Sequence, residues 1–144
     1  MSVLNINKKS DEIFNNLKRF ILAKYTPKDN EQIEVLKNVV DNKYPLVVFE
    51  TNSNSTDSLT QDEYRMDHVR NLSFEVNILA INIGHIDASV ICEELSNLVC
   101  YVFNQYYGMQ GGIDAKLKNI NPAKAKKYVL HFNCKWNVRQ NILY

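Results

Sequence analysis

A strict alternation of apolar and polar side chains near the end of the chain constrains the fold more than any other feature of the sequence. Between residues 128 and 138 every second side chain is apolar, the members being Leu130, Phe132, Cys134, Trp136 and Val138. Successive side chains of a β-strand point to opposite faces of a sheet, so this pattern predicts a strand with one buried face. Such a strand must be paired to be ordered, and we therefore expect residues 128–144 to be integral to the fold.

Three other segments are predicted strands. Residues 70–82 alternate over a similar length, and residues 113–118 alternate over a shorter one. Residues 45–51 form an apolar run that begins with proline, which is tolerated at the first position of a strand. Together with the last segment, these predict a sheet of four strands.

The first predicted helix begins at Ser10 or Asp11, either of which can cap it, and ends near Tyr25. Apolar side chains recur in it at intervals of three and four residues, which is the spacing of a helix with one buried side. Residues 31–41 also carry apolar side chains at helical spacing, but over a short length. We interpret that segment as either a short helix or an irregular connector.

The second predicted helix runs from Asp87 to about Tyr106. A wide apolar stripe along it, with Val90 and Tyr106 among its inward positions, predicts the central helix of the core. The glycine-rich stretch at 108–112 then predicts a helix stop followed by a flexible turn.

The order helix, strand, strand, helix, strand, strand predicts an α+β fold with a mainly antiparallel four-stranded sheet and helices packed on one face. We expect a single domain over residues 1–144, because this length suffices for one core. Residues 52–68, between the first two strands, are rich in Asn, Ser, Thr and Asp and have no apolar period. They predict a long polar loop, and loops of this length in compact domains are often functional.

Composition argues against several classes of protein. The 17 basic and 16 acidic side chains nearly cancel, so no overall field draws the chain to nucleic acid or to an anionic membrane. No apolar run approaches the ~20 residues of a membrane span, and the start has no signal-peptide core. The cysteines Cys92, Cys100 and Cys134 lie in apolar patterns without metal-binding spacing, which indicates reduced, buried thiols in a cytoplasmic product.

The sequence has no motif for catalysis or for a cofactor. His68, His85 and His131 fall in a predicted loop, a turn and the polar face of a strand, without a partner at metal-binding spacing. We therefore expect no catalytic residue, no metal and no cofactor. The alternative is an enzyme that uses Cys100 or Cys134 with His131, although burial makes a thiol inert.

Two local charge clusters are the candidate interaction residues. The loop is acidic and the segment between the last two strands is basic: the loop carries Asp57, Asp62, Glu63 and Asp67 against Arg65, and the basic segment carries Lys116, Lys118, Lys124, Lys126 and Lys127. Lysines at sheet edges are often present only to prevent unwanted pairing. If the two clusters lie on opposite flanks, neighbouring copies can pair head to tail and close into a ring. Nucleic-acid binding by the lysines is the alternative, although Tyr128 is the one aromatic residue close to them.

The element order, the polar loop and three segments resemble the tail terminator (tail completion) proteins of tailed bacteriophages and phage-tail-like particles. The segments are "RNLSFEVNILAIN", "DASVICEELSNLVCYVFNQYY" and "YVLHFNCKWNVRQNILY". The resemblance extends from Asp11 to Tyr144 and is one of architecture, without a catalytic motif.

This resemblance implies a structural virion protein that is not an enzyme. It implies a homo-oligomeric ring, a hexamer in that family, that caps the completed tail tube, stops its growth and offers a surface for head attachment. The expected partners are further copies, the tail tube protein and the head completion or connector protein, with nucleic acid only as the passing genome and no membrane. The expected location is the tail or neck of the virion, after assembly in the host cytoplasm. A different head–tail joining or minor capsid protein is the alternative within the same class.

Overall fold

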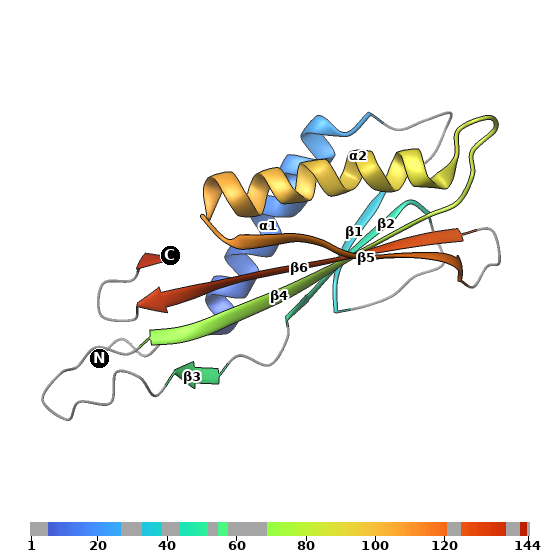
Figure 1. The fold of residues 1–144 in the computed structure, drawn as a ribbon. Helices are drawn as coiled ribbons and strands as arrows, with labels where there is room; N and C mark the ends of the chain where they lie inside the picture. Colours follow the sequence, from blue (N-terminus) through green and yellow to red (C-terminus); the bar gives the residue numbers. More distant parts are fainter. Residues whose placement is uncertain are drawn as a thin grey trace, which may run out of the picture.

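A computed structural model of the chain describes residues 6–26, 33–38, 44–51, 55–57, 69–120, 125–137 and 142–143. Two helices pack against a mixed, mostly antiparallel sheet, which confirms the predicted α+β class (Figure 1). The elements, in chain order, are α1 (Ile6–Lys24), β1 (Glu34–Lys37), β2 (Leu46–Thr51), β3 (Ser55–Asp57), β4 (Val69–Ala80), α2 (Ala88–Tyr101), the π-helical turn η2 (Val102–Tyr106), β5 (Gln110–Ile120), β6 (Ala125–Asn137) and β7 (Ile142–Leu143).

The sheet has five main strands in the order β1-β2-β4-β6-β5, so the prediction of four strands is wrong by one. β1 pairs with β2 in parallel, and the other main pairs are antiparallel. β4 and β6 stay paired from Val69↔Asn137 to Ala80↔Lys126. The short strand β3 pairs with the first residues of β4, on the side of β4 where β2 pairs further along. The short strand β7 pairs with the last residues of β6, on the side where β5 pairs earlier in β6.

The fifth strand, β1, corrects the interpretation of residues 31–41 as a helix or a connector. Residues 34–37 are extended and pair with β2, and Val35 points into the core with 2% of its surface exposed. A strand of four residues with one buried side chain is too short to show a period of two. The helical spacing of the apolar residues in this segment arose by chance and led to the wrong interpretation.

The glycine-rich stretch after α2 is also corrected. Gly108, at φ +61°, lies in the turn, but Gly111 and Gly112 already belong to β5. Gly111 has φ +140°, and a Cβ built there would lie 2.0 Å from the backbone oxygen of His131. Glycine is required at this position because β5 approaches β6 too closely for any side chain.

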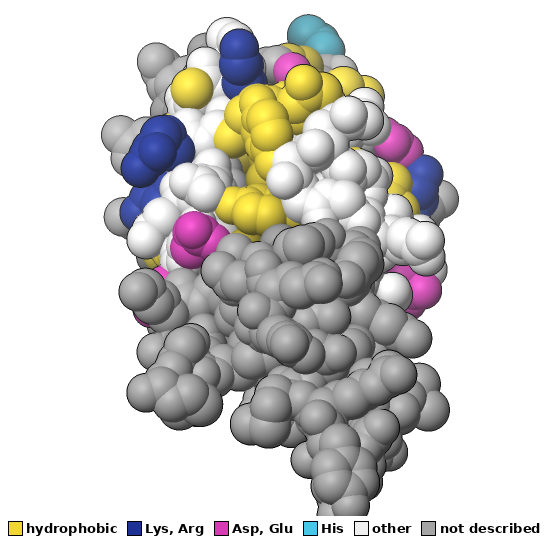
Figure 2. Space-filling view, turned by 90° about the vertical axis from the view of Figure 1, so that its left-hand side faces the viewer, with side chains coloured by type: hydrophobic (Ala, Val, Ile, Leu, Met, Phe, Trp, Pro, Cys, Tyr) yellow, Lys and Arg dark blue, Asp and Glu magenta, His cyan; other side chains and the backbone are white. Residues whose placement is uncertain are grey.

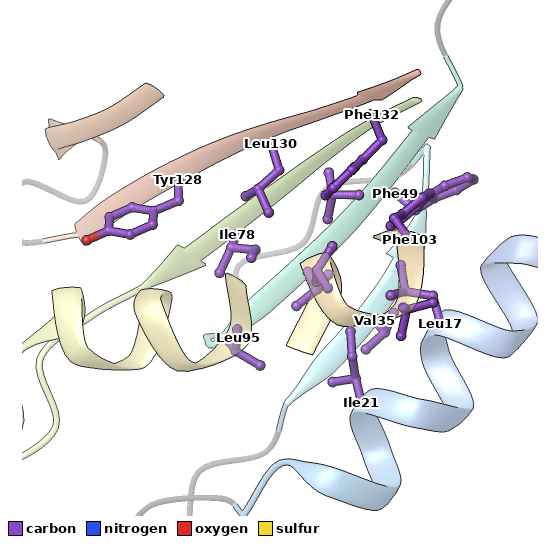
Figure 3. Packing of buried hydrophobic residues seen from close by; sticks show 14 of the residues in the cluster. Leu17, Ile21, Val35, Phe49, Ile78, Leu95, Phe103, Tyr128, Leu130 and Phe132 are labelled. Carbon is purple, nitrogen blue, oxygen red and sulfur yellow. The ribbon is translucent and has the colours of Figure 1, made fainter. Parts of the chain in front are cut away.

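The two helices cover the same face of the sheet and share one core (Figure 3). α1 contributes Ile13, Leu17 and Ile21, which are fully buried, and it begins at Ile6, earlier than the predicted cap. α2 begins as predicted, because the Asp87 carboxylate accepts a hydrogen bond from the Ser89 backbone N–H at 2.9 Å. The inward placement of Val90 and Tyr106 is wrong, because they are 53% and 61% exposed.

Stacked aromatic rings form the centre of the core. Phe103 lies parallel to Phe132 with ring centroids 4.2 Å apart, and Phe49 stacks on Phe74 at 5.3 Å. All four side chains are fully buried, and burial of one such ring contributes roughly 1.5–3 kcal/mol. The predicted inward positions of Leu130 and Phe132 on β6 are confirmed, whereas the side chains of Cys134, Trp136 and Val138 lie outside those that the structure describes.

Candidate interaction surfaces

Two of the predicted interface lysines are bonded to acidic residues of the same chain. Lys116 Nζ lies 2.6 Å from Glu93 Oε1, and Lys126 Nζ lies 2.7 Å from Asp87 Oδ1. The Lys126 bond, together with the Ser89 backbone N–H, lowers the pKa of Asp87 to about 2. These pairs tie the β5–β6 hairpin to α2, so the acidic partners of these lysines lie on the helix of the same chain.

The other predicted interface residues are placed only in part. Lys127 is half-buried on the far face of the sheet, where its charge acts on the Glu50 carboxyl. Asp57 and Lys118 lie in β3 and β5, but their side chains are outside those described. Asp62, Glu63, Arg65, Asp67 and Lys124 fall outside the described residues, as does most of the predicted loop at 52–68, although residues 55–57 form β3.

Sequence reasoning missed a polar row across the face of the sheet that is turned away from the helices. Glu50 of β2 is paired with Glu75 of β4, and Glu75 is paired with His131 of β6. His131 Nε2 lies 2.8 Å from Glu75 Oε1, and its Nδ1 lies 3.2 Å from Asp114 Oδ2. Since its two ring nitrogens face Glu75 of β4 and Asp114 of β5, His131 bridges the strands on either side of β6.

Asn77 completes this row. Its Nδ2 donates to Glu75 Oε2 at 2.9 Å and to Glu50 Oε2 at 3.2 Å, and the residue is 5% exposed. Burial is the largest cause that raises the pKa of Glu50, and the neighbouring Glu75 carboxyl raises it further. Burial alone would raise the pKa of Glu75 too, but the bonds from Asn77, Glu50 and His131 lower it. The pKa values of the two carboxyls therefore shift in opposite directions, as expected for neighbouring acids that interact.

A second missed feature is an exposed aromatic cluster, formed by Phe20, Tyr101 and Tyr106. Phe20 stacks on Tyr101 at a centroid distance of 5.4 Å, and Tyr106 lies edge-on to both rings, at 6.0 Å and 5.7 Å. Tyr101 is 49% exposed and Tyr106 is 61% exposed. Figure 2 views the end of the molecule at which α2 finishes, where hydrophobic side chains gather in the upper half with charged side chains at their margins.

The π-helical turn η2 brings the two tyrosines of the aromatic cluster together. In an α-helix, residues five positions apart differ in direction by about 140°, because one turn takes 3.6 residues. A π-turn bonds residue i to residue i+5, so residues five apart lie close to one full turn from each other. Tyr101 directly precedes η2 and Tyr106 is its last residue, so the two rings lie in contact.

An open pocket of about 520 Å³ lies beside the aromatic cluster. It is lined by Asn16, Arg19, Phe20, Ala23, Tyr106 and Tyr107. Asn16 Nδ2 donates to the Tyr107 hydroxyl at 2.6 Å, which links α1 to the residue that follows η2. Pockets with an aromatic wall and one charged group are suited to a side chain of a partner protein.

The described thiols are poor nucleophiles. Burial raises the pKa of the Cys92 thiol to about 12, and its Sγ is within 3.7 Å of the Lys126 carbonyl oxygen. Burial also raises the pKa of Cys100, which is half-buried. Burial therefore favours the protonated form of both thiols, and a protonated thiol is a weaker nucleophile than a thiolate.

No protein-family model matches this chain, and no curated protein matches it. Within the described parts of the chain, no three His, Cys, Asp or Glu side chains are arranged to hold a metal ion. Neither of the helices that the structure describes is both long and apolar enough to cross a membrane.

Proposed function

We propose that this chain is a structural subunit that assembles head to tail into a ring on the end of a phage tail tube, where it ends tube growth and presents a surface for head attachment. The resemblance to tail terminator proteins supports this function, and a hexamer is the ring size that the resemblance implies. A ring needs two different surfaces on each subunit that fit each other.

The observation that carries the proposal is the pair of unlike edges of the sheet. In the described part of the chain, β1 forms one edge and β5 forms the other. β5 leaves Ile113 and Leu117 exposed by 37% and 43%, so this edge has both free backbone groups and apolar side chains. An edge of this kind favours contact with another chain.

Electron microscopy of the purified full chain, with and without tail tubes, tests the proposal. Annular particles and decorated tube ends are expected. A protein that stays monomeric at high concentration and leaves tube ends bare would overturn it. Rings that bind the portal side and not the tube would instead identify a head–tail joining protein.

A charged substitution tests the role of the β5 edge. Leu117→Glu is expected to shift the purified protein towards monomers in size-exclusion chromatography with light scattering, because it places a charge in the contact. Val90→Glu is the matched control, since Val90 is also exposed, at 53%, but lies on α2. Equal effects of the two variants would assign the contact to another surface.

A further inference from the structure

The pocket beside the aromatic cluster is positively charged. Among its lining residues Arg19 is the charged one, and the rest are aromatic, amide or alanine side chains. α1 also exposes Lys24, close to Arg19 in sequence. The chemistry that fits is a carboxylate for the guanidinium and an apolar side chain for the aromatic wall.

The arrangement of the rings favours a peptide over a nucleic-acid strand. Proteins that bind single strands hold successive bases on separate aromatic platforms along a basic groove. In the aromatic cluster the rings contact one another, with Phe20 stacked on Tyr101 and Tyr106 edge-on to both. This geometry builds one compact wall and not a row of platforms.

A segment of complementary chemistry is present in the same chain. Residues 58–68 carry Asp62, Glu63 and Asp67 against Arg65 alone, with Tyr64 beside the acids. The basic hairpin is a weaker counterpart than the sequence indicated, because Lys116 and Lys126 already bond Glu93 and Asp87. Arg19 makes no such pair in the described part of the chain and lines an open pocket.

We propose that the pocket lined by Arg19 and Tyr106 receives residues 58–68 of a second copy of the chain. The Arg19 guanidinium binds a carboxylate of that segment, and an apolar side chain of the segment packs against Tyr106. The inference rests on the proposed function, because it supplies a head-to-tail contact from which a ring can close.

A complementation experiment on the full chain tests this contact. One variant carries Arg19→Glu and keeps its acidic segment; the other carries Asp62→Asn, Glu63→Gln and Asp67→Asn and keeps its pocket. We expect each alone to associate about tenfold more weakly than the parent, and their equimolar mixture to recover a dimer, because the mixture retains one intact pocket and one intact segment. Analytical ultracentrifugation measures both effects. A mixture that recovers no dimer would overturn the proposal. Binding of the segment to the pocket of its own chain would give this result.

A labelled peptide of residues 58–68, titrated into the variant with the neutralised segment, gives a second readout. Binding is expected to weaken about tenfold with Arg19→Glu added and to fall with Tyr106→Ala, and to stay unchanged with Lys18→Glu. Lys18 is the matched control, since it is exposed and adjacent but does not line the pocket. Equal losses for Arg19→Glu and Lys18→Glu, or displacement of the peptide by oligo-dT, would overturn the assignment.

The two proposals fail in different ways. Rings that form on tube ends while the peptide does not bind would overturn the pocket contact and leave the proposed function intact. Peptide binding and complementation in a protein that forms dimers, but neither rings nor tube caps, would overturn the proposed function and leave the contact intact.

Discussion

Glu50 and Glu75 are direct cross-strand partners on β2 and β4, and both carboxyl groups accept a hydrogen bond from Asn77 Nδ2 on the face of the sheet away from the helices. Like charges directly opposite each other destabilise a sheet. The repulsion is offset in part because Asn77 donates to both carboxyls and His131 bonds Glu75. Burial and the neighbouring Glu75 carboxyl raise the pKa of Glu50, whereas the bonds from Asn77 and His131 lower the pKa of Glu75 in spite of its burial.

This pair predicts that Glu50→Gln stabilises the protein at neutral pH. A raised pKa in the folded state means that the stabilising contribution of Glu50 is present below the unfolded-state pKa and is lost as pH rises through the folded-state pKa. Gln cannot ionise, so the free energy of unfolding should increase by about 0.5 kcal/mol at pH 7 and change less at pH 4. Urea unfolding at the two pH values measures this difference.

Glu75→Gln provides the opposite case. The pKa of Glu75 is lowered, so its contribution is present above its unfolded-state pKa and lost as pH falls through the folded-state pKa. Glu75→Gln should therefore destabilise the protein at pH 7. Two variants with the same sign at pH 7 would contradict the opposite pKa shifts of the two carboxyls.

Gly111→Ala should destabilise the fold while Gly112→Ala is tolerated. A Cβ at Gly111 meets the His131 backbone oxygen at 2.0 Å, and φ there is +140°, whereas a Cβ at Gly112 has nothing within 4 Å. The Gly111 change is expected to cost more than about 1 kcal/mol, since neither strand can move without breaking the ladder. Thermal melting of the two variants is the measurement, and equal melting temperatures would show that β5 can separate from β6 at little cost.

Asp87→Ala should destabilise the protein more than Asp87→Asn. Asn can still cap α2 through Ser89, but it loses the ion pair with Lys126, while Ala loses both. Because the pKa of Asp87 is lowered to about 2, its charge contribution is present above the unfolded-state value and is lost as pH falls through about 2. The gap between Asp87→Asn and the parent should close in acid, and a gap that persists at low pH would indicate that the ion pair is not its source.

Phe103→Ala should lower the free energy of unfolding by about 3–5 kcal/mol, because it leaves a cavity against Phe132 in a core where both rings are fully buried. Val90→Ala, at a position 53% exposed on the same helix, should change it by less than about 0.5 kcal/mol. Denaturant unfolding distinguishes the two, and a small loss for Phe103→Ala would mean that the neighbouring side chains fill the space.

The parts of the fold that the sequence predicted are those whose signal is local. The alternation over 70–82 and 128–138 appears as β4 and β6, and Asp87 caps α2 as its position suggested. β1 was missed because a four-residue edge strand has too few positions to show a period. Its partner β2 begins only at Leu46, so the residues of β1 themselves carry no sign of the pairing.

The surfaces were harder to predict because they depend on register and helix geometry. Glu75 and His131 each looked like an ordinary solvated position on the polar side of a strand, and only the alignment of β4 with β6 joins them. Tyr106 looked like a core residue because an α-helical period was assumed through the end of α2. The π-turn rotates it outwards, where it is 61% exposed.

The π-turn also bears on how the aromatic cluster responds to a change in the length of the helix. A π-turn holds one residue more than an α-turn, so deleting one residue between 102 and 105 would let α2 continue as a regular α-helix. Both tyrosines would survive such a deletion and would then stand four residues apart, a spacing that places two side chains on one face of a regular α-helix. We therefore expect the contact between their rings to persist in related chains that differ here by one inserted or deleted residue.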